Sequence, residues 1–391
     1  MRNLPSYTAL CAACLIPAIL SCTRREPDEG RDAVRIVFNS PVVGNPVKGT
    51  GILDGTTYTD AQGDFIVWGY VANAPGINPA SAGSNGIEYI AGATCKHESS
   101  YWIPYYEYKD ADNVTQTGYY YWRSTAGYMT FQALSPASAF STDPAVRASL
   151  HDWSTGMQLS AYSVETSPGA QSDVLFSDYT MPSQRGDYTG TPYGVDLKFN
   201  HALAAVKFRF REYQDYADGG ASPIVITKVE VLNAYRTGNF AENRTPAALN
   251  SYTAAPAWTG QNTETDFTVF NKPAAEGITL TWGTSEAVIT EPVGAPLLII
   301  PQDLDHTADG LGKVSVRVTF TQDGGSSTTT VSASLPGLRG THSGSPIVVN
   351  DWAIGKRYTY VVTIGLNKII FDPTVEDWVW DPTEDIFVMI G

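Results

Sequence analysis

The feature that most constrains the fold is an alternation of apolar and polar side chains with a period of two residues. It is clearest in residues 206–210, 314–320 and 358–364, where Val, Phe, Tyr or Ile recurs at every second position. Successive side chains of a strand point to opposite faces, so this period predicts strands with one face on a core and the other toward water. Residues 34–38, which alternate in the same way, and residues 65–70 are expected to form two further strands.

Helical patterning is confined to one short segment. Residues 144–153 read as a helix, with Asp143 as its N-cap and Pro144 in its first turn. Elsewhere Gly, Pro, Asn and Asp separate short strand patterns, which favours β-sandwiches over a parallel sheet with crossover helices. The sequence therefore predicts an all-β fold.

Length and composition predict two domains. The chain has 391 residues, of which 43% are hydrophobic and only 17% charged, and it contains 22 Tyr, 35 Gly and 24 Pro. Such a length suits two domains, and such a composition suits many short strands joined by tight turns. The Gly- and Tyr-rich residues 186–194 separate two strand-rich halves. We expect an N-terminal β-sandwich domain at 34–190 and a C-terminal one at 191–391.

Charge and cysteine content exclude several classes of protein. The net charge is -15, and no Lys/Arg run is interleaved with aromatic residues after the leader, so nucleic acid is not an expected partner. Cys11, Cys14 and Cys22 fall in the leader, which leaves Cys95 alone in the folded part. One thiol forms neither an intramolecular disulfide nor a Cys-based zinc cluster, so the fold must be held by core burial.

The first 21 residues are predicted to be a lipoprotein signal peptide. Arg2 precedes an apolar stretch at residues 9–20 that is too short to span a bilayer. The residues Ile19, Leu20, Ser21 and Cys22 resemble the bacterial lipobox, whose cysteine is acylated and becomes the new N-terminus. Cys22 is therefore the expected lipid attachment site, with outer-membrane lipid as its partner. The alternative is an ordinary signal peptide with an incidental cysteine.

Residues 22–33 are predicted to be an acidic tether. Glu26, Asp28 and Glu29 resemble the export signal that sends lipoproteins to the outer face of the outer membrane in Bacteroides-like bacteria. We therefore expect a surface-exposed lipoprotein of the cell outer membrane. Acidic tethers are also simply soluble, so this signal is weaker than the lipobox.

Four segments of the chain carry a recognisable pattern when taken in order, namely residues 197–208, 296–302, 352–360 and 369–378. Together with the lipobox they resemble the fimbrillin family, the subunits and anchors of the pili of Bacteroides and Porphyromonas. A fifth segment, residues 121–136, matches more loosely, because Arg123 stands where Pro often follows Trp.

The resemblance implies two transthyretin-like β-sandwich domains with Greek-key connections, and assembly by donor-strand exchange. In that scheme a protease removes the N-terminal strand, and a strand of a neighbouring subunit fills the exposed groove. This is β-augmentation, in which ladder hydrogen bonds give strength and alternate side chains fill pockets. Val34, Ile36 and Phe38 would be the core-facing residues of the removable first strand.

The chain departs from the family at the expected cleavage point. Stalk subunits are usually cut after an arginine in the loop following the first strand, yet no arginine lies between Arg35 and Arg123. Lys48 is the only basic residue in the expected loop and is the candidate processing site. Either a protease of different specificity cuts there, or the strand stays and the protein is a terminal subunit.

The C-terminal tail is a candidate donor strand. Ile386, Val388 and Ile390 alternate with other residues beyond Trp378. The alternative is that they form the last edge strand of the second sandwich.

Two aromatic clusters are candidates for glycan stacking. Tyr101, Trp102, Tyr121 and Trp122 lie in Tyr- and Trp-rich runs, and aromatic faces bind the apolar faces of sugars. The alternative is that these residues serve core packing and hairpin pairing.

No catalytic or metal-binding motif emerges from the sequence. Cys95 and His97 have the spacing of a strand-borne metal pair but lack further ligands nearby, and the acidic loop at 303–310 has Val314 where a calcium loop needs Glu. A Gly-x-Ser-x-Gly elbow and a Gly-rich phosphate loop are both missing from the sequence. We expect no enzyme activity, no cofactor and no metal site.

These observations favour a structural subunit or adhesin of a donor-strand-exchange pilus that acts in cell adhesion. Its expected partners are other pilus subunits and a host or bacterial glycan or protein receptor. The alternative is a non-polymerising surface lipoprotein that binds glycans. Whether the subunit belongs to the stalk, the anchor or the tip is left open by the sequence.

The lipoprotein prediction is tested by replacing Cys22 with alanine. Each buried methylene of an acyl chain contributes about 0.8 kcal/mol to membrane binding, so loss of the acylated thiol should release the protein. We expect the C22A variant to lose palmitate labelling and to leave the membrane fraction. Unchanged membrane fractionation of the variant would contradict the prediction.

Overall fold

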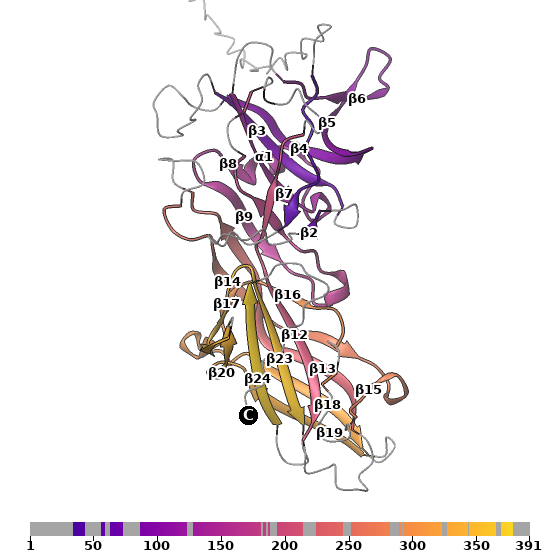
Figure 1. Cartoon of the computed structure of the whole chain (residues 1–391), viewed down its shortest axis with the longest axis vertical. Helices are drawn as coiled ribbons and strands as arrows, with labels where there is room; N and C mark the ends of the chain where they lie inside the picture. The colour runs from indigo at the N-terminus through magenta and orange to yellow at the C-terminus, as the bar shows by residue number, and fades with distance from the viewer. Residues whose placement is uncertain are drawn as a thin grey trace, which may run out of the picture. The chain divides into compact units, whose positions relative to one another are not determined.

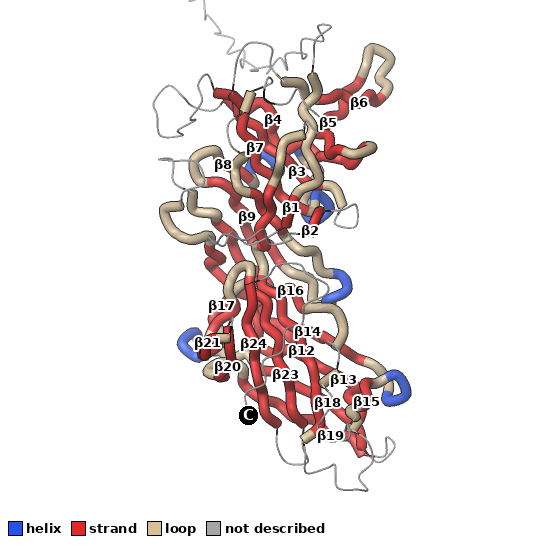
Figure 2. The backbone as a smooth tube through the Cα atoms, in the orientation of Figure 1, coloured by secondary structure: helices blue, strands red, loops and turns tan. Residues whose placement is uncertain are grey.

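The computed structural model of the chain is mostly β, as the alternation predicts (Figures 1 and 2). The residues that it describes contain a single short α-helix, α1 (Pro144–Ser149), and none of their helices is long and apolar enough to cross a membrane. The Asp143 side chain accepts a hydrogen bond from the backbone N–H of Ala145, which confirms the predicted N-cap. The described residues are 34–43, 56–58, 63–72, 87–122, 128–180, 183–184, 187, 194–213, 224–244, 252–281, 289–290, 293–322, 327–342, 344–364 and 369–377.

The largest sheet has nine strands in the order β2-β1-β11-β10-β7-β3-β4-β5-β6. Neighbouring strands are antiparallel except β1 and β11, which run parallel. Figure 1 shows β3, β4 and β7 side by side. The strands are β1 (Val42–Val43), β2 (Thr56–Thr57), β3 (Phe65–Ala72), β4 (Ile87–Glu98), β5 (Tyr101–Lys109), β6 (Thr115–Tyr119), β7 (Tyr128–Ser135), β10 (Leu175–Ser177) and β11 (Lys198–His201).

A seven-stranded sheet is organised around the long strand β13. Its order is β19-β18-β13-β9-β8, and both β14 and β15 also pair with β13. The predicted alternation at 314–320 is found in β18. The strands are β8 (His151–Asp152), β9 (Gly156–Ser163), β13 (Val225–Ala241), β14 (Ala257–Asn271), β15 (Ile278–Thr279), β18 (Ser315–Gln322) and β19 (Ser327–Ser334).

A six-stranded sheet has the order β16-β12-β23-β24-β20-β21, and β17 and β22 form a separate pair. The predicted strands at 206–210 and 358–364 are found in β12 and β23, which run parallel to each other. The strands are β12 (Ala204–Glu212), β16 (Leu297–Ile299), β17 (Gln302–Asp303), β20 (Leu338–His342), β21 (Ser345–Val349), β22 (Asp351–Trp352), β23 (Lys356–Ile364) and β24 (Ile369–Asp377).

The buried apolar residues form two hydrophobic cores, the first enclosed by the nine-stranded sheet and the chain bonded to it, the second shared by all three sheets. The first core contains Phe65 and Val67 of β3, whereas the second contains Ile66 and Trp68 of the same strand. Because alternate residues of β3 enter different cores, this strand is buried on both faces rather than on one.

The second core also joins the six- and seven-stranded sheets. Phe208 of β12 and Tyr360 of β23 stack in it with their ring centroids 5.6 Å apart. Val316 and Val318 of β18 enter the same core. The two sheets therefore bury alternate residues against each other. The transthyretin-like topology and the Greek-key connections stay predictions.

Strand pairing crosses the domain boundary predicted at residue 190. β9, which precedes it, pairs with β13 of the seven-stranded sheet, and β11, which follows it, pairs with β1 and β10 of the nine-stranded sheet. Both sheets thus draw strands from either side of the boundary. The division into domains at 34–190 and 191–391 stays a prediction.

Candidate functional site

The first segment, defined as residues 34–43, is hydrogen-bonded along one side to the end of the nine-stranded sheet that carries β5 and β6. The backbone N–H of Ile36 donates to the Tyr120 carbonyl at 2.9 Å, and the N–H of Trp122 donates to the Val34 carbonyl at 2.9 Å. Phe38 and Trp102 exchange two backbone hydrogen bonds of 2.8 and 2.9 Å. On this side the first segment runs antiparallel to residues 120–122 and to β5.

The other side of the first segment is bonded to the chain just before and within β11. The N–H of Val195 donates to the Val37 carbonyl at 2.9 Å, and the N–H of Asn39 donates to the Val195 carbonyl at 3.0 Å. The Asn39 amide also donates to the Gly194 carbonyl at 2.9 Å and to Asp196 Oδ1 at 2.7 Å. The segment therefore joins two ends of the same sheet.

Residues 34–38 do not form the regular strand that the sequence predicts. They make isolated bridges, from Arg35 to Tyr121 and from Phe38 to both Trp102 and Val195. The neighbour on one side changes from residues 120–122 to Trp102 within three residues, so no continuous ladder is formed. The side-chain alternation is nevertheless the predicted one.

Side chains of the first segment fill the first core. Ile36 and Phe38 are fully buried, and Val34 is half-buried against the same core. The Phe38 ring meets the edges or faces of Phe65 and Phe131 at centroid distances of 6.1 and 5.2 Å. Burial of such side chains contributes about 1.5–3 kcal/mol each. Without the segment, this core would present a groove shaped for alternate apolar side chains.

The structure thus brings Val34, Ile36 and Phe38 together, but other predicted site residues lie outside the described residues. Their roles in lipid attachment, processing and strand donation stay predictions. These residues are Cys22, Lys48, Ile386, Val388 and Ile390.

The aromatic residues predicted to stack on glycans divide into two groups. Trp102 and Trp122 are buried in the first core, whereas Tyr101 and Tyr121 are half-buried. The indole faces are therefore packed against the protein, and a stacking role for the two tryptophans does not fit the structure. Successive residues of an extended chain face opposite sides, so a Tyr-Trp pair cannot present both rings on one face.

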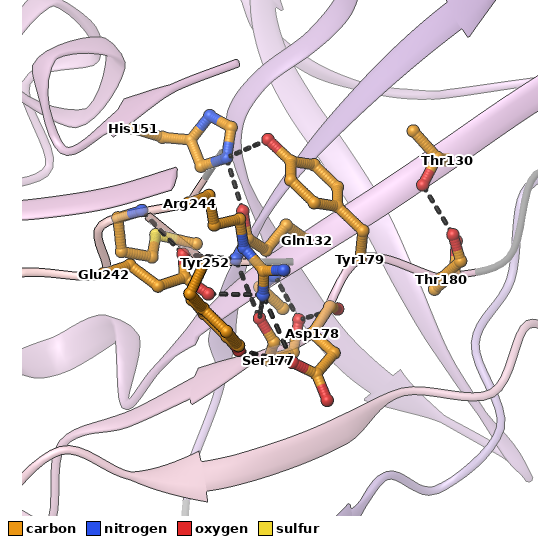
Figure 3. Close-up of polar contacts among 12 residues, drawn as sticks. Thr130, Gln132, His151, Ser177, Asp178, Tyr179, Thr180, Glu242, Arg244 and Tyr252 are labelled. Carbon is orange, nitrogen blue, oxygen red and sulfur yellow. Dashed lines mark hydrogen bonds and ion pairs between the residues drawn. The ribbon is translucent and has the colours of Figure 1, made fainter. Parts of the chain in front are cut away.

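A buried polar network lies where the nine- and seven-stranded sheets meet, and sequence reasoning missed it (Figure 3). Gln132 of β7 donates through Nε2 to Glu242 Oε2 at 2.7 Å and to the Ser177 carbonyl at 2.8 Å. Glu242 also accepts from the Met157 N–H at 2.9 Å and forms an ion pair with Arg244. Burial raises the pKa of Glu242, although Arg244 opposes this shift.

Arg244 adds a second link between the network and the nine-stranded sheet. Its Nη2 lies 3.2 Å from Asp178 Oδ1, and its guanidinium lies 4.9 Å from the centre of the Tyr179 ring and 5.0 Å from that of Tyr252. The Tyr252 hydroxyl donates to the same Asp178 oxygen at 3.0 Å. Because Arg244 follows β13 and Asp178 follows β10, these contacts tie one sheet to the other.

His151 of β8 is held neutral inside the network. The two donor bonds of the Gln132 amide fix its oxygen toward His151 Nε2, which lies 2.6 Å away and must carry the proton. His151 Nδ1 then accepts from the Tyr70 hydroxyl at 2.7 Å, and the ring stacks on Trp68. Burial lowers the pKa of His151 to about 3.

The polar network has the features of a structural element rather than of a catalytic site. His151, Glu242 and Arg244 are all buried, and both ring nitrogens of His151 are hydrogen-bonded. In the described part of the chain no group of three His, Cys, Asp or Glu side chains could hold a metal ion. Cys95 is buried, and burial raises the pKa of its thiol well above the usual range.

Comparison with known proteins identifies the family. A sequence model described as fimbrillin-like matches residues 92–378, which is more than half of the chain. The chain belongs to the fimbrillin-like family. This confirms the resemblance seen in the sequence. The family is structural and non-enzymatic, in agreement with the prediction that the chain is not an enzyme.

Solved structures similar to this fimbrillin-like chain have low sequence identity. A candidate cell adhesion protein from Bacteroides ovatus is 14% identical with a TM-score of 0.48, and the match covers 90% of this chain and 100% of that one. A fimbrial protein from Bacteroides vulgatus is 15% identical with a TM-score of 0.42, covering 88% and 99%. The tip fimbrial protein Mfa3 from Porphyromonas gingivalis is 11% identical with a TM-score of 0.34, covering 81% and 94%. No curated protein matches the chain.

A glycine makes room for the polar network of this fimbrillin-like protein. Gly156 has a φ of 79°, and a Cβ added to it would lie 2.2 Å from Glu242 Oε2. The G156A variant would combine backbone strain with displacement of a buried carboxylate, so we expect it to lose about 3 kcal/mol of unfolding free energy. Denaturant unfolding measures this loss.

Gly169 supplies the matched control, because a Cβ added there would meet nothing within 4 Å. The G169A variant should change the free energy of unfolding by less than about 0.5 kcal/mol. Equal stability of the two variants would show that the network does not depend on close packing at Gly156.

The neutral state of His151 predicts a pH dependence. Between about pH 6.5 and 3 the unfolded chain binds a proton at His151 that the folded chain excludes, so His151 makes stability fall as pH falls through this window. The slope for one proton is about 1.4 kcal/mol per pH unit. Unfolding of the H151Q variant, followed from pH 6.5 to 4, should show a shallower slope, whatever its stability at pH 7.

Glu242 acts in the opposite direction, because its raised pKa lets the folded chain bind a proton more readily. The comparison of slopes between the parent chain and H151Q removes this contribution, since Glu242 is present in both. Identical slopes would mean that His151 binds its proton equally well in the folded and the unfolded chain, and so is not held neutral by folding.

Proposed function

We propose that this fimbrillin-like protein is a structural subunit or adhesin of a pilus assembled by donor-strand exchange. It is exported as a lipoprotein of the outer membrane and acts at the cell surface in cell adhesion. The observation that supports the proposal best is the first segment, whose backbone is bonded on both sides and whose alternate side chains fill the first core.

The first segment is followed by a stretch of chain that contains the candidate processing site, as a removable strand requires. Its last strand, β1, pairs with β2, and Lys48 lies between them in the sequence. A cut after Lys48 would leave the first segment held only by non-covalent contacts. Those contacts are the backbone bonds and the buried side chains that a replacement strand would have to reproduce.

The C-terminal tail has the side-chain spacing of such a replacement. Ile386, Val388 and Ile390 recur at every second position, as Val34, Ile36 and Phe38 do. An extended tail would therefore present three apolar side chains on one face, in the spacing that the first core receives from the first segment. The partner is accordingly another subunit. The lipid on Cys22 holds the chain at the membrane for as long as the first segment is attached.

Proteolysis tests this proposal. The mature protein treated with a lysine-specific protease should lose its covalent link at Lys48, keep its body intact and form ladders on non-boiled gels. The K48A variant should stay monomeric under the same treatment. A chain that ends at residue 384 should be cut but should form no ladder, because it has no strand to donate.

A peptide of the tail separates strand acceptance from polymerisation. A labelled peptide of residues 384–391 should bind the cut, tail-less chain, while the same peptide with Val388 replaced by Asp should not, because the charge would enter an apolar groove. A cut chain that binds neither its own tail nor this peptide would contradict strand exchange.

A further inference from the structure

A row of two cations and two tyrosines crosses four neighbouring segments on the outer face of the nine-stranded sheet. Tyr105 of β5 and Tyr119 of β6 are direct cross-strand partners. The Lys96 ammonium lies 4.3 Å from the centre of the Tyr105 ring, and the Arg35 guanidinium lies 4.0 Å from that of Tyr119. We call Lys96, Tyr105, Tyr119 and Arg35 the cation row.

Strand register places the whole cation row on one face. Cys95 and Trp102 enter the first core, so the adjacent residue Lys96 and the odd-numbered residues of β5 point the other way. Arg35 bridges to Tyr121, which shares a face with Tyr119, while Ile36 enters the core. Both cations are exposed and both rings are half-buried.

The cations of the row are oriented by the tyrosine rings, and neither forms an ion pair with an acidic residue that the structure describes. Hydrogen bonding to Tyr105, with smaller effects of Asp64 and Glu107, raises the pKa of Lys96. Stacking on an aromatic ring contributes about 0.5–1 kcal/mol at an exposed site and restricts the cation. A restricted cation loses less entropy when it binds an anion.

The charge of the rest of the protein restricts the size of the ligand. The chain as a whole carries a net charge of -15, so a long polyanion would be repelled beyond the row. At physiological salt, charges more than about 8 Å away are largely screened, so a compact anion responds mainly to the two nearby cations. The phenol hydroxyls of Tyr105 and Tyr119 suit a ligand that carries hydroxyl groups as well as a carboxylate.

We infer that the cation row binds a sugar acid, a carboxylate-bearing sugar at the end of a glycan, with Arg35 and Lys96 attracting its carboxylate from the two ends of the row and the tyrosines contacting its hydroxyl groups. This ligand site differs from the strand-exchange groove, because the row lies on the outer face of the sheet. Since Arg35 belongs to the first segment, the complete row exists only in the uncut chain.

Binding to the uncut mature chain tests the inference. The probes are N-acetylneuraminic acid and glucuronic acid, with glucose as the neutral comparison, and the readout is the Kd from ligand-observed NMR titration. We expect both acids to bind, glucose not to bind, and each of R35Q and K96Q to weaken binding about tenfold through loss of a charge-assisted contact. Binding should also weaken as salt is raised.

The matched control is K272Q, because Lys272, which directly follows β14, is an exposed cation that pairs with Glu276 and lies outside the row. It should leave the Kd unchanged, and unfolding midpoints equal to the parent's show that R35Q and K96Q are folded. Cutting after Lys48 and removing the first segment should weaken binding as R35Q does.

The inference is overturned if neither acid binds, if glucose binds as well as the acids, or if R35Q and K96Q bind like K272Q. Tighter binding of hexaglutamate or heparin than of the single sugar acids would also overturn it, in favour of an extended acidic partner. These measurements use the uncut monomer, so their failure would leave strand exchange untouched.

Discussion

Burial of the middle of the nine-stranded sheet, around β3 and β7, on both of its faces is the constraint on which the rest of the structure depends. Through β3 the sheet supplies Phe65 and Val67 to the first core and Ile66 and Trp68 to the second. The first segment contributes to the first core alone, whereas the second core is built without it. The core that joins the three sheets is therefore independent of the first segment, and this separation of the two cores is the feature that the proposed strand exchange would require.

The polar network adds a different kind of connection between the sheets. Burying the ions of Glu242 and Arg244 costs desolvation free energy, so the network is not explained as a simple gain in stability. The network instead orients the sheets, because its hydrogen bonds and ion pairs form only when β7, β10 and β13 hold one relative position. Apolar surfaces can slide against one another with little change in buried area, whereas a network of short polar contacts cannot. The network therefore fixes the relative position of the nine- and seven-stranded sheets.

Much of the fold could be predicted from the sequence, since period-two alternation is a local property of strands. It located β12, β18 and β23 and placed Ile36 and Phe38 on a core-facing side. It could not show that residues 34–38 change neighbours and form only isolated bridges, because pairing depends on residues more than 60 positions away. The resemblance to the family, now established for residues 92–378, indicated the class of protein, which periodicity alone could not do.

The polar network and the cation row were beyond sequence reasoning for the same physical reason. Gln132, His151 and Glu242 are scattered through the chain, and nothing in their local surroundings indicates that they share hydrogen bonds. A glycine such as Gly156 marks close packing only after its neighbour is known. In the Tyr-Trp runs the alternation rule predicts that neighbouring rings face opposite sides, but only the structure shows that Trp102 and Trp122 are the ones that face the core.

The contact between Asn39 and Gly194 has a consequence for the order in which the protein folds. These residues are 155 positions apart, so the earliest part of the folded body to leave the ribosome cannot find its place until nearly half of the chain has been made. Closing such a long loop is entropically costly and slows folding. The first core is therefore completed late, only after the chain near residue 194 has been made and has met the first segment.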